Sequence, residues 1–351
     1  MMNSTEDQEA WQENLLLGVS RTFALTIPQL PPELRGVVGN AYLLCRLVDT
    51  IEDEPALSID EKHRYCATFA AVVAGQADPA ELSSELAPKL SPATLEAEHE
   101  LVREMPRVIA ITRTYRPAQQ QAIERCVRIM SDGMARFQDK ASLAGLEDQA
   151  ELDHYCYYVA GVVGEMLTEL FCEYSPSIAR HRDQMIRLSI SFGQGLQMTN
   201  ILKDIWEDRR RGVCWLPQST FSPRGIDLKK LEDADPKAFA DGLEELLGIA
   251  RQHLRNALSY TLTLPREETG IRNFCLWALG MAVLTLRRIH RNPDFRTGTE
   301  VKISRRSVRM TIAALRIAAS RDHVLKLLFS LAAHSLPKTS ADVMPQLNTP
   351  S

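Results

Sequence analysis

The sequence predicts an all-α fold, and three observations support this prediction. Long amphipathic stretches with a period near 3.6 residues dominate the chain. Apolar runs with a period of two, bounded by hairpin turns, are scarce. With 351 residues, of which 45% are hydrophobic, the chain is long enough to bury a large core. We therefore expect a single helical domain.

The amphipathic stretches predict the helices in chain order, because each carries its apolar side chains at helical spacing. The expected helices cover residues 33–53, 59–74, 94–113, 117–139, 150–172, 178–209, 235–262, 270–291 and 304–335. Breaks rich in Pro and Ser at 75–92 and 217–225 are interpreted as loops inside one domain. Residues 1–13 are expected to form a flexible N-terminus, and residues 337–351 a disordered tail.

Charge and cysteine content argue against several classes of protein. Forty-one basic against 45 acidic residues leave a formal charge of −4, so no global basic field argues for nucleic-acid binding. The seven cysteines are scattered without a CxxC pair, which fits buried free thiols in a reducing compartment. The N-terminus is polar, unlike a secretory signal, and the apolar stretch 325–334 is too short to span a bilayer. We expect a cytoplasmic protein with transient peripheral membrane contact, and the sequence indicates no protein partner.

The first predicted helix ends in LLCRLVDTIEDEP (43–55), in which Asp49 and Asp53 lie four residues apart. One side of a helical wheel carries the apolar residues Leu44, Leu47, Val48 and Ile51. The other side carries Tyr42, Arg46, Asp49 and Asp53. Taken alone, this pattern favours an ordinary solvent face with an i, i+3 ion pair. We call the Asp49 and Asp53 pair the first acidic edge.

A second stripe changes this interpretation. In GLQMTNILKDIWEDRRRG (195–212), one helical face carries Gln197, Asn200, Asp204 and Asp208. The pair Asp204 and Asp208 is called the second acidic edge. Side chains at i and i+4 lie roughly 5–6 Å apart at Cβ, close enough to share one hard cation or bracket two. Mg²⁺ typically takes one or two carboxylates plus phosphate oxygens, so the two edges predict a site for Mg²⁺ and diphosphate.

A third stripe lies in YCYYVAGVVGEMLTELF (155–171). On a regular α-helix, Tyr158, Gly161 and Glu165 share one side. A tyrosine above a glycine on a buried helix suggests a polar group over a cleared surface. The alternative is ordinary helix packing at Gly161, which this stripe alone slightly favours.

Six motifs together resemble the squalene synthases of the squalene/phytoene synthase family. They are, in order, SRTFA (20–24), YLLCRLVDTIED (42–53), MARFQDK (134–140), YCYYVAGVVG (155–164), LQMTNILKDIWED (196–208) and NFC (273–275). The later EVKIS (300–304) resembles squalene synthases more than phytoene synthases, whereas GEML (164–167) and WLP (215–217) resemble bacterial carotenoid-type members. We expect a bacterial-type member without the membrane anchor of eukaryotic squalene synthases.

The resemblance implies an all-α isoprenoid-synthase (terpenoid synthase) fold, with one catalytic domain over residues 14–336. It implies helices around a central cavity, with the two acidic edges facing each other across its mouth. The implied reaction is the head-to-head condensation of two farnesyl diphosphates through presqualene diphosphate, followed by NADPH-dependent reduction to squalene. The implied enzyme is a farnesyl-diphosphate farnesyltransferase of isoprenoid and sterol or hopanoid biosynthesis, with Mg²⁺ and NADPH as cofactors.

Breaking an allylic C–O bond expels a charged diphosphate, so its stabilisation is the first demand on the site. The resemblance and this demand assign Mg²⁺ to Asp49, Asp53, Asp204 and Asp208, with Glu52 and Asn200 as further ligands. Arg46 is placed to add a guanidinium to the same oxygens. The resemblance assigns phosphate contacts to Arg21 and Ser20, and Gln197 is expected to orient diphosphate or water.

The carbocation must then lose a proton in a dry cavity. Tyr158 matches the family tyrosine proposed to assist proton transfer, and a diphosphate oxygen is the competing base. Phe23, Tyr42 and Phe274 are expected to shape the prenyl channel or to stabilise positive charge, with plain core packing as the alternative.

Reduction requires basic residues on the cofactor phosphates. By resemblance these are Lys203, Lys302 and Arg305, together with Arg21 and Arg46. Family squalene synthases commonly carry Arg where Lys203 stands, and Ser304 occupies a basic position. Lys keeps the charge but loses the bidentate fork, which leaves the choice between NADPH and NADH open. The runs 209–211 and 305–306 equally fit solvated residues or partners of loop carboxylates.

Two rival functions remain. A dehydrosqualene or phytoene synthase of the same family would release its product without reduction. A non-catalytic helical assembly factor would keep the fold, yet the loss of one acidic edge expected of such a protein is absent from this sequence.

Overall fold

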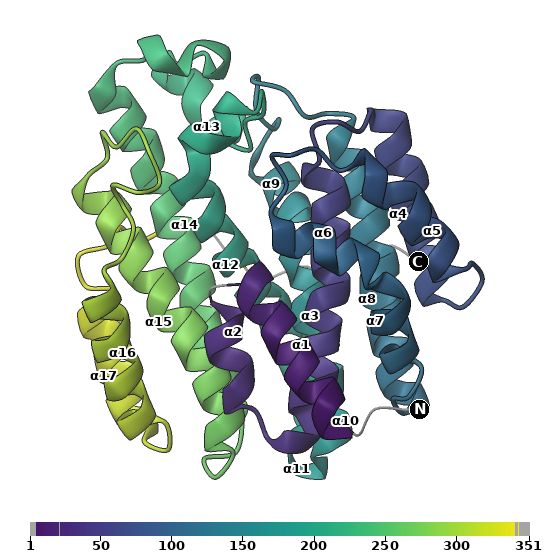
Figure 1. The fold of residues 1–351 in the computed structure, drawn as a ribbon. Coiled ribbons are helices and arrows are strands. Elements are labelled where there is room, and N and C mark those ends of the chain that lie inside the picture. Colours follow the sequence, from purple (N-terminus) through teal and green to yellow (C-terminus); the bar gives the residue numbers. More distant parts are fainter. Residues whose placement is uncertain (1–4, 21, 341–342, 344–351) are drawn as a thin grey trace. The chain divides into compact units, whose positions relative to one another are not determined.

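The computed structural model describes residues 5–20, 22–340 and 343, and this part of the chain contains helices and turns with no β-strand (Figure 1). An isolated β-bridge joins Leu146 and Pro217 in loops. The predicted all-α class is confirmed. The described helices form two compact units, divided after Asp139, with Met166–Arg180 returning to the first unit and the chain from His181 onward belonging to the second.

The first unit is built around one long helix, α3 (Pro32–Asp53). Its helices are α1 (Thr5–Val19), α2 (Phe23–Thr26), η1 (Ile27–Gln29), α3, α4 (Ile59–Val73), α5 (Pro79–Leu86), η2 (Ala87–Lys89), α6 (Glu96–Arg103), α7 (Met105–Thr112), α8 (Pro117–Gln138) and α11 (Pro176–Ala179). Proline at the first position of α3 suits a helix start, because its missing N–H has no helical acceptor there. Helix α3 packs against α8, α1 and α7, and its apolar stripe lies in the core of this unit.

Residues 5–13, expected in a flexible terminus, lie instead in α1. Gln12 is buried and donates to the Asn40 side chain at 2.9 Å, and Asn40 donates to Thr112 Oγ1 at 2.6 Å. These hydrogen bonds join α1, α3 and α7. The polar sequence of α1 concealed this role, because the partner that satisfies the buried Gln12 is distant in the sequence.

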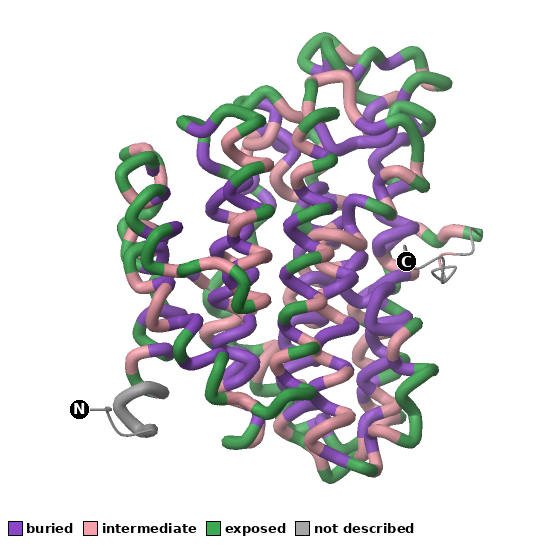
Figure 2. The backbone as a smooth tube through the Cα atoms, turned by 90° about the vertical axis from the view of Figure 1, so that its right-hand side faces the viewer, coloured by how far each residue is buried: buried purple, intermediate pink, exposed green. Residues whose placement is uncertain are grey.

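The second unit is organised by α12 (Arg182–Arg210), which packs against α14 and α15 (Figure 1). Its helices are α9 (Gln149–Cys156), the π-helical segment η3 (Tyr157–Gly161), α12, α13 (Gln218–Phe221), η4 (Ser222–Arg224), η5 (Leu228–Asp233), α14 (Pro236–Thr263), α15 (Thr269–Arg291), α16 (Arg305–Ala318) and α17 (Asp322–Ala332). Helix α10 (Val162–Tyr174) begins in this unit and ends in the first. Buried positions recur at helical spacing along the long helices (Figure 2).

Two predicted helices are split in the structure. The window 94–113 divides into α6 and α7 at Glu104, because Pro106 at the start of α7 has no N–H to continue the hydrogen bonding of α6. The window 304–335 divides into α16 and α17 around Arg321, whose φ of −117° and ψ of 88° lie outside the helical region.

Helix α15 is long and apolar enough to cross a membrane by length and composition, but 67% of its most apolar window is buried within the protein. Its contacts with α14, α12 and α16 account for that composition. The cysteines are free thiols, and all are buried except the half-buried Cys172, as the sequence predicted. Of the predicted tail, Pro337 accepts a hydrogen bond from Arg251 at 3.3 Å, while residues 341–342 and 344–351 lie outside the described part of the chain.

Candidate active site

The first acidic edge lies on the last two turns of α3. The predicted apolar stripe of Leu44, Leu47, Val48 and Ile51 is fully buried. On the other side, Arg46 and Asp49 keep 25% and 31% of their side-chain surface exposed, and Asp53 is exposed. The helical wheel therefore predicted the facing of these residues correctly. The polar side is half-enclosed rather than an open solvent face.

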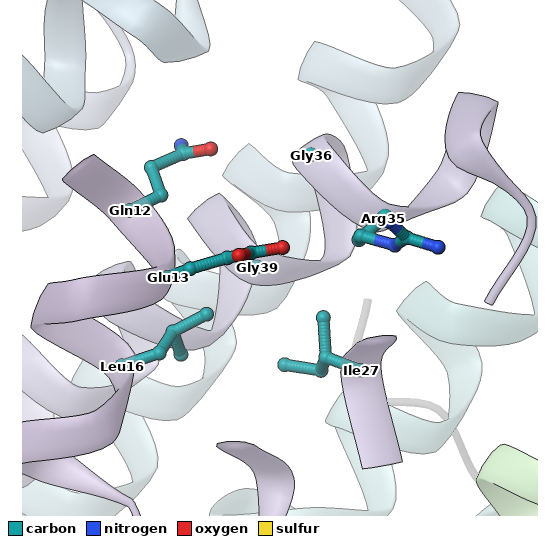
Figure 3. A pocket seen from close by; sticks show the side chains of 7 residues that line it. All are labelled: Gln12, Glu13, Leu16, Ile27, Arg35, Gly36 and Gly39. Carbon is teal, nitrogen blue, oxygen red and sulfur yellow. The ribbon is translucent and has the colours of Figure 1, made fainter. Parts of the chain in front are cut away.

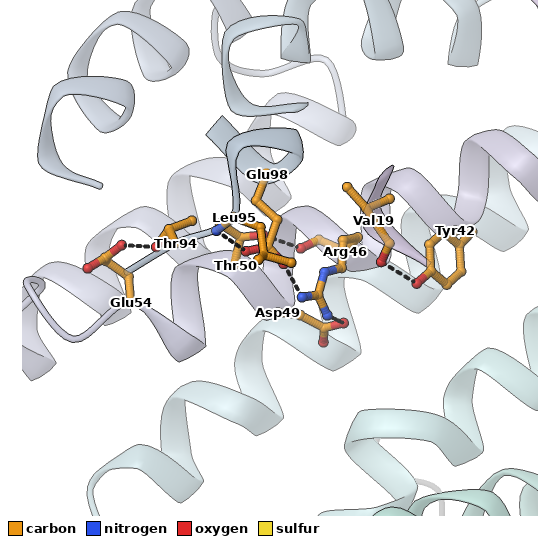
Figure 4. A network of polar contacts seen from close by, with 9 residues as sticks. All are labelled: Val19, Tyr42, Arg46, Asp49, Thr50, Glu54, Thr94, Leu95 and Glu98. Carbon is orange, nitrogen blue, oxygen red and sulfur yellow. Dashed lines mark hydrogen bonds and ion pairs between the residues drawn. The ribbon is translucent and has the colours of Figure 1, made fainter. Parts of the chain in front are cut away.

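Arg46 is shared between two carboxylates (Figure 4). Its Nη1 lies 3.6 Å from Asp49 Oδ2, and its Nη2 donates to Glu98 Oε1 on α6. Glu98 is buried and also accepts the backbone N–H of Leu95 at 3.3 Å. Sequence reasoning missed Glu98, because no motif marks it and only the fold places α6 beside α3. It aims the guanidinium along the acidic edge.

Asp49 is held in an unusual electrostatic state. Burial raises its pKa to about 7, Arg46 opposes that change, and Asp53 and Glu98 add to it. The neighbouring Glu54 behaves in the opposite way. Burial raises its pKa, but hydrogen bonds from Thr94 and from backbone N–H groups prevail and lower it (Figure 4). Glu54 is thus a satisfied structural carboxylate, whereas Asp49 lacks sufficient positive charge around it, which fits a site for a cation.

Glu52, predicted as a further metal ligand, is more deeply buried than Asp49 and already has a hydrogen-bond donor. Its carboxylate is buried and accepts a hydrogen bond from Gln138 on α8 at 3.0 Å. Lys62 donates to its backbone carbonyl rather than to its carboxylate. Burial raises the pKa of Glu52 to about 8, with Asp53 and Asp49 adding to the effect. A metal role for Glu52 stays a prediction and would require the Gln138 bond to be shared or released.

Several predicted substrate-binding residues gather beside Arg46. The rings of Phe23 and Tyr42 lie 5.2 Å apart, and the Tyr42 hydroxyl donates to the Val19 carbonyl at 3.3 Å. Ser20 Oγ accepts the Phe23 N–H at 3.0 Å. Burial raises the pKa of Tyr42, and a hydrogen bond with the Ser20 side chain acts against that change. Arg21, which follows Ser20 in the predicted motif SRTFA (20–24), lies outside the described residues.

A small recess in the first unit lies elsewhere. It is lined by Gln12, Glu13, Leu16, Ile27, Arg35, Gly36 and Gly39 (Figure 3). Gly39 precedes Asp49 by ten residues on the same helix, which corresponds to roughly 15 Å. The recess is therefore separate from the first acidic edge.

The second acidic edge lies on the last turns of α12, above the buried residues Met198, Ile201, Leu202 and Ile205. Asp204 Oδ2 lies 2.9 Å from Lys203 Nζ. Burial raises the pKa of Asp204, and Lys203 partly offsets that effect. Asp208 and Gln197 are half-buried, and Asn200 is exposed. The two carboxylates of each edge thus share one side of their helix, as predicted.

A loop between α15 and α16 packs onto this edge. The Gly298 N–H donates to Glu207 Oε1 at 2.9 Å. A Cβ on Gly298 would stand 3.0 Å from Asp204 Oδ1 and 3.2 Å from the Lys203 carbonyl, so this close approach favours glycine. Arg296 of the same loop stacks 4.5 Å over the Trp206 ring. Sequence reasoning missed Glu207, although it stands inside the quoted motif WED.

Of the predicted cofactor residues, Lys203, Lys302 and Arg305 belong to the second unit, whereas Arg46 lies on α3 of the first unit. Lys203 is bound to Asp204, and its carbonyl lies against the loop at Gly298. Lys302 follows four residues later and is exposed, and Arg305 is the exposed first residue of α16. The structure therefore brings Lys203 to the loop that carries Lys302.

One arginine of the basic run at 209–211 forms an ion pair that joins α12 to η5. Arg209 is buried, donates to both carboxylate oxygens of Glu232 at 2.7 and 2.9 Å, and donates to the Leu228 carbonyl at 2.6 Å. This matches the alternative that the run neutralises loop carboxylates. Arg305 and Arg306, by contrast, are both exposed.

Tyr158 stands on the π-helical segment η3, which the α-helical wheel did not anticipate. The Tyr157 hydroxyl donates to the buried Glu165 at 3.1 Å. The two tyrosine rings meet edge to face at 5.5 Å. A π-turn inserts one extra residue, so it rotates every later side chain relative to a regular helix. The predicted sharing of one side by Tyr158 and Glu165 is thereby altered.

Glycines explain how η3 packs on α12. A Cβ on Gly193 would stand 2.2 Å from the Ala160 carbonyl oxygen, and one on Gly164 would stand 2.3 Å from the Ser189 carbonyl oxygen. At Gly161 an added Cβ would meet Tyr157 at 2.9 Å and Ile190 at 3.3 Å. The alternative of helix packing at Gly161 is therefore confirmed.

Within the described residues, no group of three or more His, Cys, Asp or Glu side chains is arranged to hold a metal ion. Each edge instead supplies two carboxylates on one side of a helix. Such a donor set suits Mg²⁺, which completes its octahedral shell with water and phosphate oxygens.

The raised pKa of Asp49 predicts a pH-dependent stability of the metal-free protein. The folded pKa of about 7 exceeds the usual value of about 4, so the folded state retains a proton that the unfolded chain has lost. Stability should therefore fall as pH rises from about 4 to about 7. Thermal unfolding in a chelator should show this slope, and Asp49→Asn should reduce it, leaving the part that comes from Glu52, whose pKa is raised to about 8. Equal slopes in both proteins would contradict the assignment, as would Mg²⁺ binding that does not tighten with pH.

The fold and these residues define an all-α protein that carries a DxxxD edge in each of its two units. The family model for squalene/phytoene synthases matches residues 16–307, which span both units. The chain belongs to the squalene/phytoene synthase family.

Curated relatives agree with this assignment. The chain is 31% identical over 283 residues to the squalene synthase of Eremothecium gossypii and 30% identical over 292 residues to that of Mus musculus. These alignments cover 79% and 81% of this chain but only 61% and 64% of the relatives. With squalene synthase BSS of Botryococcus braunii, the chain shares 30% identity over 336 residues, which cover 92% of this chain and 68% of that protein.

Solved structures share the fold. A squalene synthase complex, TcSQS with the ligand BPH1237, superposes with a TM-score of 0.77 at 23% identity and covers 95% of this chain and 94% of that one. A ligand-bound dehydrosqualene synthase superposes with a TM-score of 0.65 at 19% identity and covers 93% of this chain and 98% of that one. These likenesses support the terpenoid-synthase-like helical fold.

Proposed function

We propose that this protein joins two farnesyl diphosphates head to head through presqualene diphosphate and reduces the rearranged product to squalene with NADPH. The observation that carries the proposal is the pair of DxxxD edges, one of which holds a desolvated aspartate beside an arginine. Family membership and the squalene synthase names of the relatives support the same reaction.

The first edge suits the departure of diphosphate. Bound Mg²⁺ would offset the charge that develops on the leaving oxygens. Asp49 and Asp53 would hold the ion, and Asp204 and Asp208 would provide equivalent ligands in the second unit, with Asn200 and Gln197 nearby. Arg46, held by Glu98, would add its guanidinium charge to the same leaving group, together with Ser20 and Arg21.

The half-buried aromatic residues of the chain suit the carbocation stage. Phe23 packs on Tyr42 beside the first edge, and these aromatic rings could stabilise positive charge by cation–π contact. Tyr158, which matches the family tyrosine, would assist proton transfer, and its contact with the Tyr157 ring would help to hold its side chain in place.

NADPH would supply hydride for the final reduction. Lys203, Lys302 and Arg305 offer cationic side chains for its phosphates on the side of the second unit where the Gly298 loop packs. Lys203 would have to exchange part of its contact with Asp204 for a phosphate contact, and binding of Mg²⁺ by Asp204 would favour that exchange.

A dehydrosqualene or phytoene synthase is the second candidate. It is favoured by the likeness to a solved dehydrosqualene synthase and by the ion pair that already engages Lys203. Such an enzyme would use the same acidic edges and would release its product without a reductant.

A product assay decides between the two candidates. Purified protein is incubated with farnesyl diphosphate and Mg²⁺, with and without NADPH, and extracted lipids are identified by mass spectrometry. We expect squalene only when NADPH is present. Dehydrosqualene in both tubes, or activity only with geranylgeranyl diphosphate, would overturn the proposal.

A matched pair of variants separates the two half-reactions. Lys302→Ala combined with Arg305→Ala should lower squalene formation while presqualene diphosphate still accumulates, because the first condensation does not need the cofactor. Lys326→Ala combined with Arg321→Ala, which are exposed positions on and beside α17, should leave both steps unchanged in detergent.

A further inference from the structure

The last two helices of the second unit expose an apolar stripe. Met310 and Ile317 on α16 are 62% and 71% exposed, and Leu327 and Leu331 on α17 are 58% and 64% exposed. These four account for half of the large hydrophobic side chains that are exposed in the described chain. The two helices contact each other and lie side by side (Figure 1).

The packing of α16 settles which side faces outward. Leu315 and Thr311 cover Gly280 of α15, where an added Cβ would meet them at 2.8 and 2.9 Å. Met310 and Ile317, seven residues apart, share a side of the helix turned away from that contact. On α17, Leu325 is buried, whereas Leu327 and Leu331 are four residues apart on the exposed side.

The same segment is strongly basic. Residues 305–332 contain six Arg or Lys side chains, namely Arg305, Arg306, Arg309, Arg316, Arg321 and Lys326, all of them exposed. The segment has a single carboxylate, Asp322, which already pairs with Arg266 at 2.7 Å and with the buried Arg272 at 2.5 Å. The exposed side is thus both apolar and cationic.

We propose that this outer face of α16 and α17 binds the surface of an anionic phospholipid bilayer. Helices that lie in a membrane interface place apolar side chains among the acyl chains and basic side chains at the headgroups. The long arginine side chains can reach headgroup phosphates while their stems cover apolar surface. Each Lys or Arg near an anionic leaflet contributes about 1 kcal/mol to binding.

The charge favours lipid over a second copy of the chain. An interface between two copies would place these arginines against one another, and protein interfaces are depleted of charge at their centres. The use of the face rests on the proposed function, whose product is a hydrocarbon without any polar group. Release into a bilayer would spare that product contact with water.

Vesicle co-sedimentation of the full chain tests the proposal without substrate. We expect binding to vesicles that contain phosphatidylglycerol and little binding to pure phosphatidylcholine. Raising the salt from about 0.1 M to about 1 M, which shortens the Debye length from about 10 Å to about 3 Å, should weaken it. Equal binding to both kinds of vesicle would show that anionic headgroups are not recognised, and the proposal would then be wrong.

Two variants locate the face. Met310→Ser with Ile317→Ser should weaken binding roughly tenfold or more, because the bound protein would lose two apolar side chains that insert among the acyl chains. Arg306→Gln with Arg309→Gln and Arg316→Gln should weaken it roughly 100-fold. Arg305 is left unchanged because it belongs to the proposed cofactor residues.

Matched controls lie in the first unit. Leu17→Ser removes an apolar side chain that is 66% exposed, and Arg113→Gln with Arg128→Gln and Arg180→Gln removes three exposed charges. Both should bind vesicles as the unmodified protein does. If instead the two α16 variants bind normally, or if the unmodified protein forms a dimer that these variants dissociate and binds no vesicles, the proposal is wrong. The α16 variants should still form product in detergent as the unmodified protein does. Product formation thus tests the proposed function separately from vesicle binding.

Discussion

Replacing Asp49 by Asn should lower turnover by roughly 1000-fold, because several kcal/mol of stabilisation of the leaving diphosphate depend on the metal that this carboxylate would hold. The amide cannot carry the negative charge that Mg²⁺ requires, while its size is nearly unchanged. The rate of product formation from farnesyl diphosphate at saturating Mg²⁺ measures the effect. Circular dichroism and thermal unfolding should show that the helical fold persists.

The same change at the second edge should have a comparable effect. Asp204→Asn removes the carboxylate that Lys203 and the Gly298 loop surround, and turnover should fall by a similar factor. Asp183→Asn is the matched control, since Asp183 stands at the start of the same helix with 90% of its side chain exposed. Asp183→Asn should leave turnover intact. Near-normal activity of either edge variant at ordinary Mg²⁺ would show that the metal ligands are assigned wrongly.

Replacing Gly193 by Ala should destabilise the second unit by about 3 kcal/mol. The added Cβ would stand 2.2 Å from the Ala160 oxygen and 2.5 Å from the Ala160 carbonyl carbon. Both are backbone atoms of the π-helical segment, so relief requires α12 and η3 to separate. Tyr158 would move with η3, and turnover should therefore fall as well. Urea unfolding monitored by circular dichroism measures the loss.

Gly36→Ala is the matched control for this prediction. Gly36 also lies inside a long helix, but its added Cβ would meet only the Tyr115 hydroxyl, at an ordinary 3.7 Å. Alanine should there stabilise the helix by about 0.5–1 kcal/mol. Opposite signs for the two variants would confirm that close backbone approach, rather than helix propensity, governs Gly193. Equal small effects would contradict the packing described for η3.

The facing of both acidic edges followed from the sequence. Period alone placed Asp49 and Arg46 opposite a buried stripe, and it did the same for Asp204 on α12. A regular helix has fixed geometry, so spacing determines which side chains share a side. The wheel could not determine whether that side meets bulk water, because enclosure depends on other elements.

Only the tertiary structure supplied Glu98, the Gly298 loop and the π-turn. Glu98 is 52 residues from Arg46 in the chain, and Gly298 is 91 residues from Glu207. Their contacts arise from the packing of separate helices and loops, which leaves no local periodic signal. The π-turn at Tyr157 breaks the period on which helical reasoning depends, so it shifted the side shared with Glu165.

The sequence by itself determined the all-α class, the two DxxxD edges and the family to which the chain belongs. These features depend on residue spacing and on ordered motifs, both of which are local. The tertiary structure decided the electrostatic state of the edges. Burial raises the pKa of Asp49 to about 7, and Glu98 accepts a hydrogen bond from Arg46, the arginine beside Asp49. Burial and charge pairing depend on atoms brought together from distant parts of the chain, and a linear pattern does not contain that information.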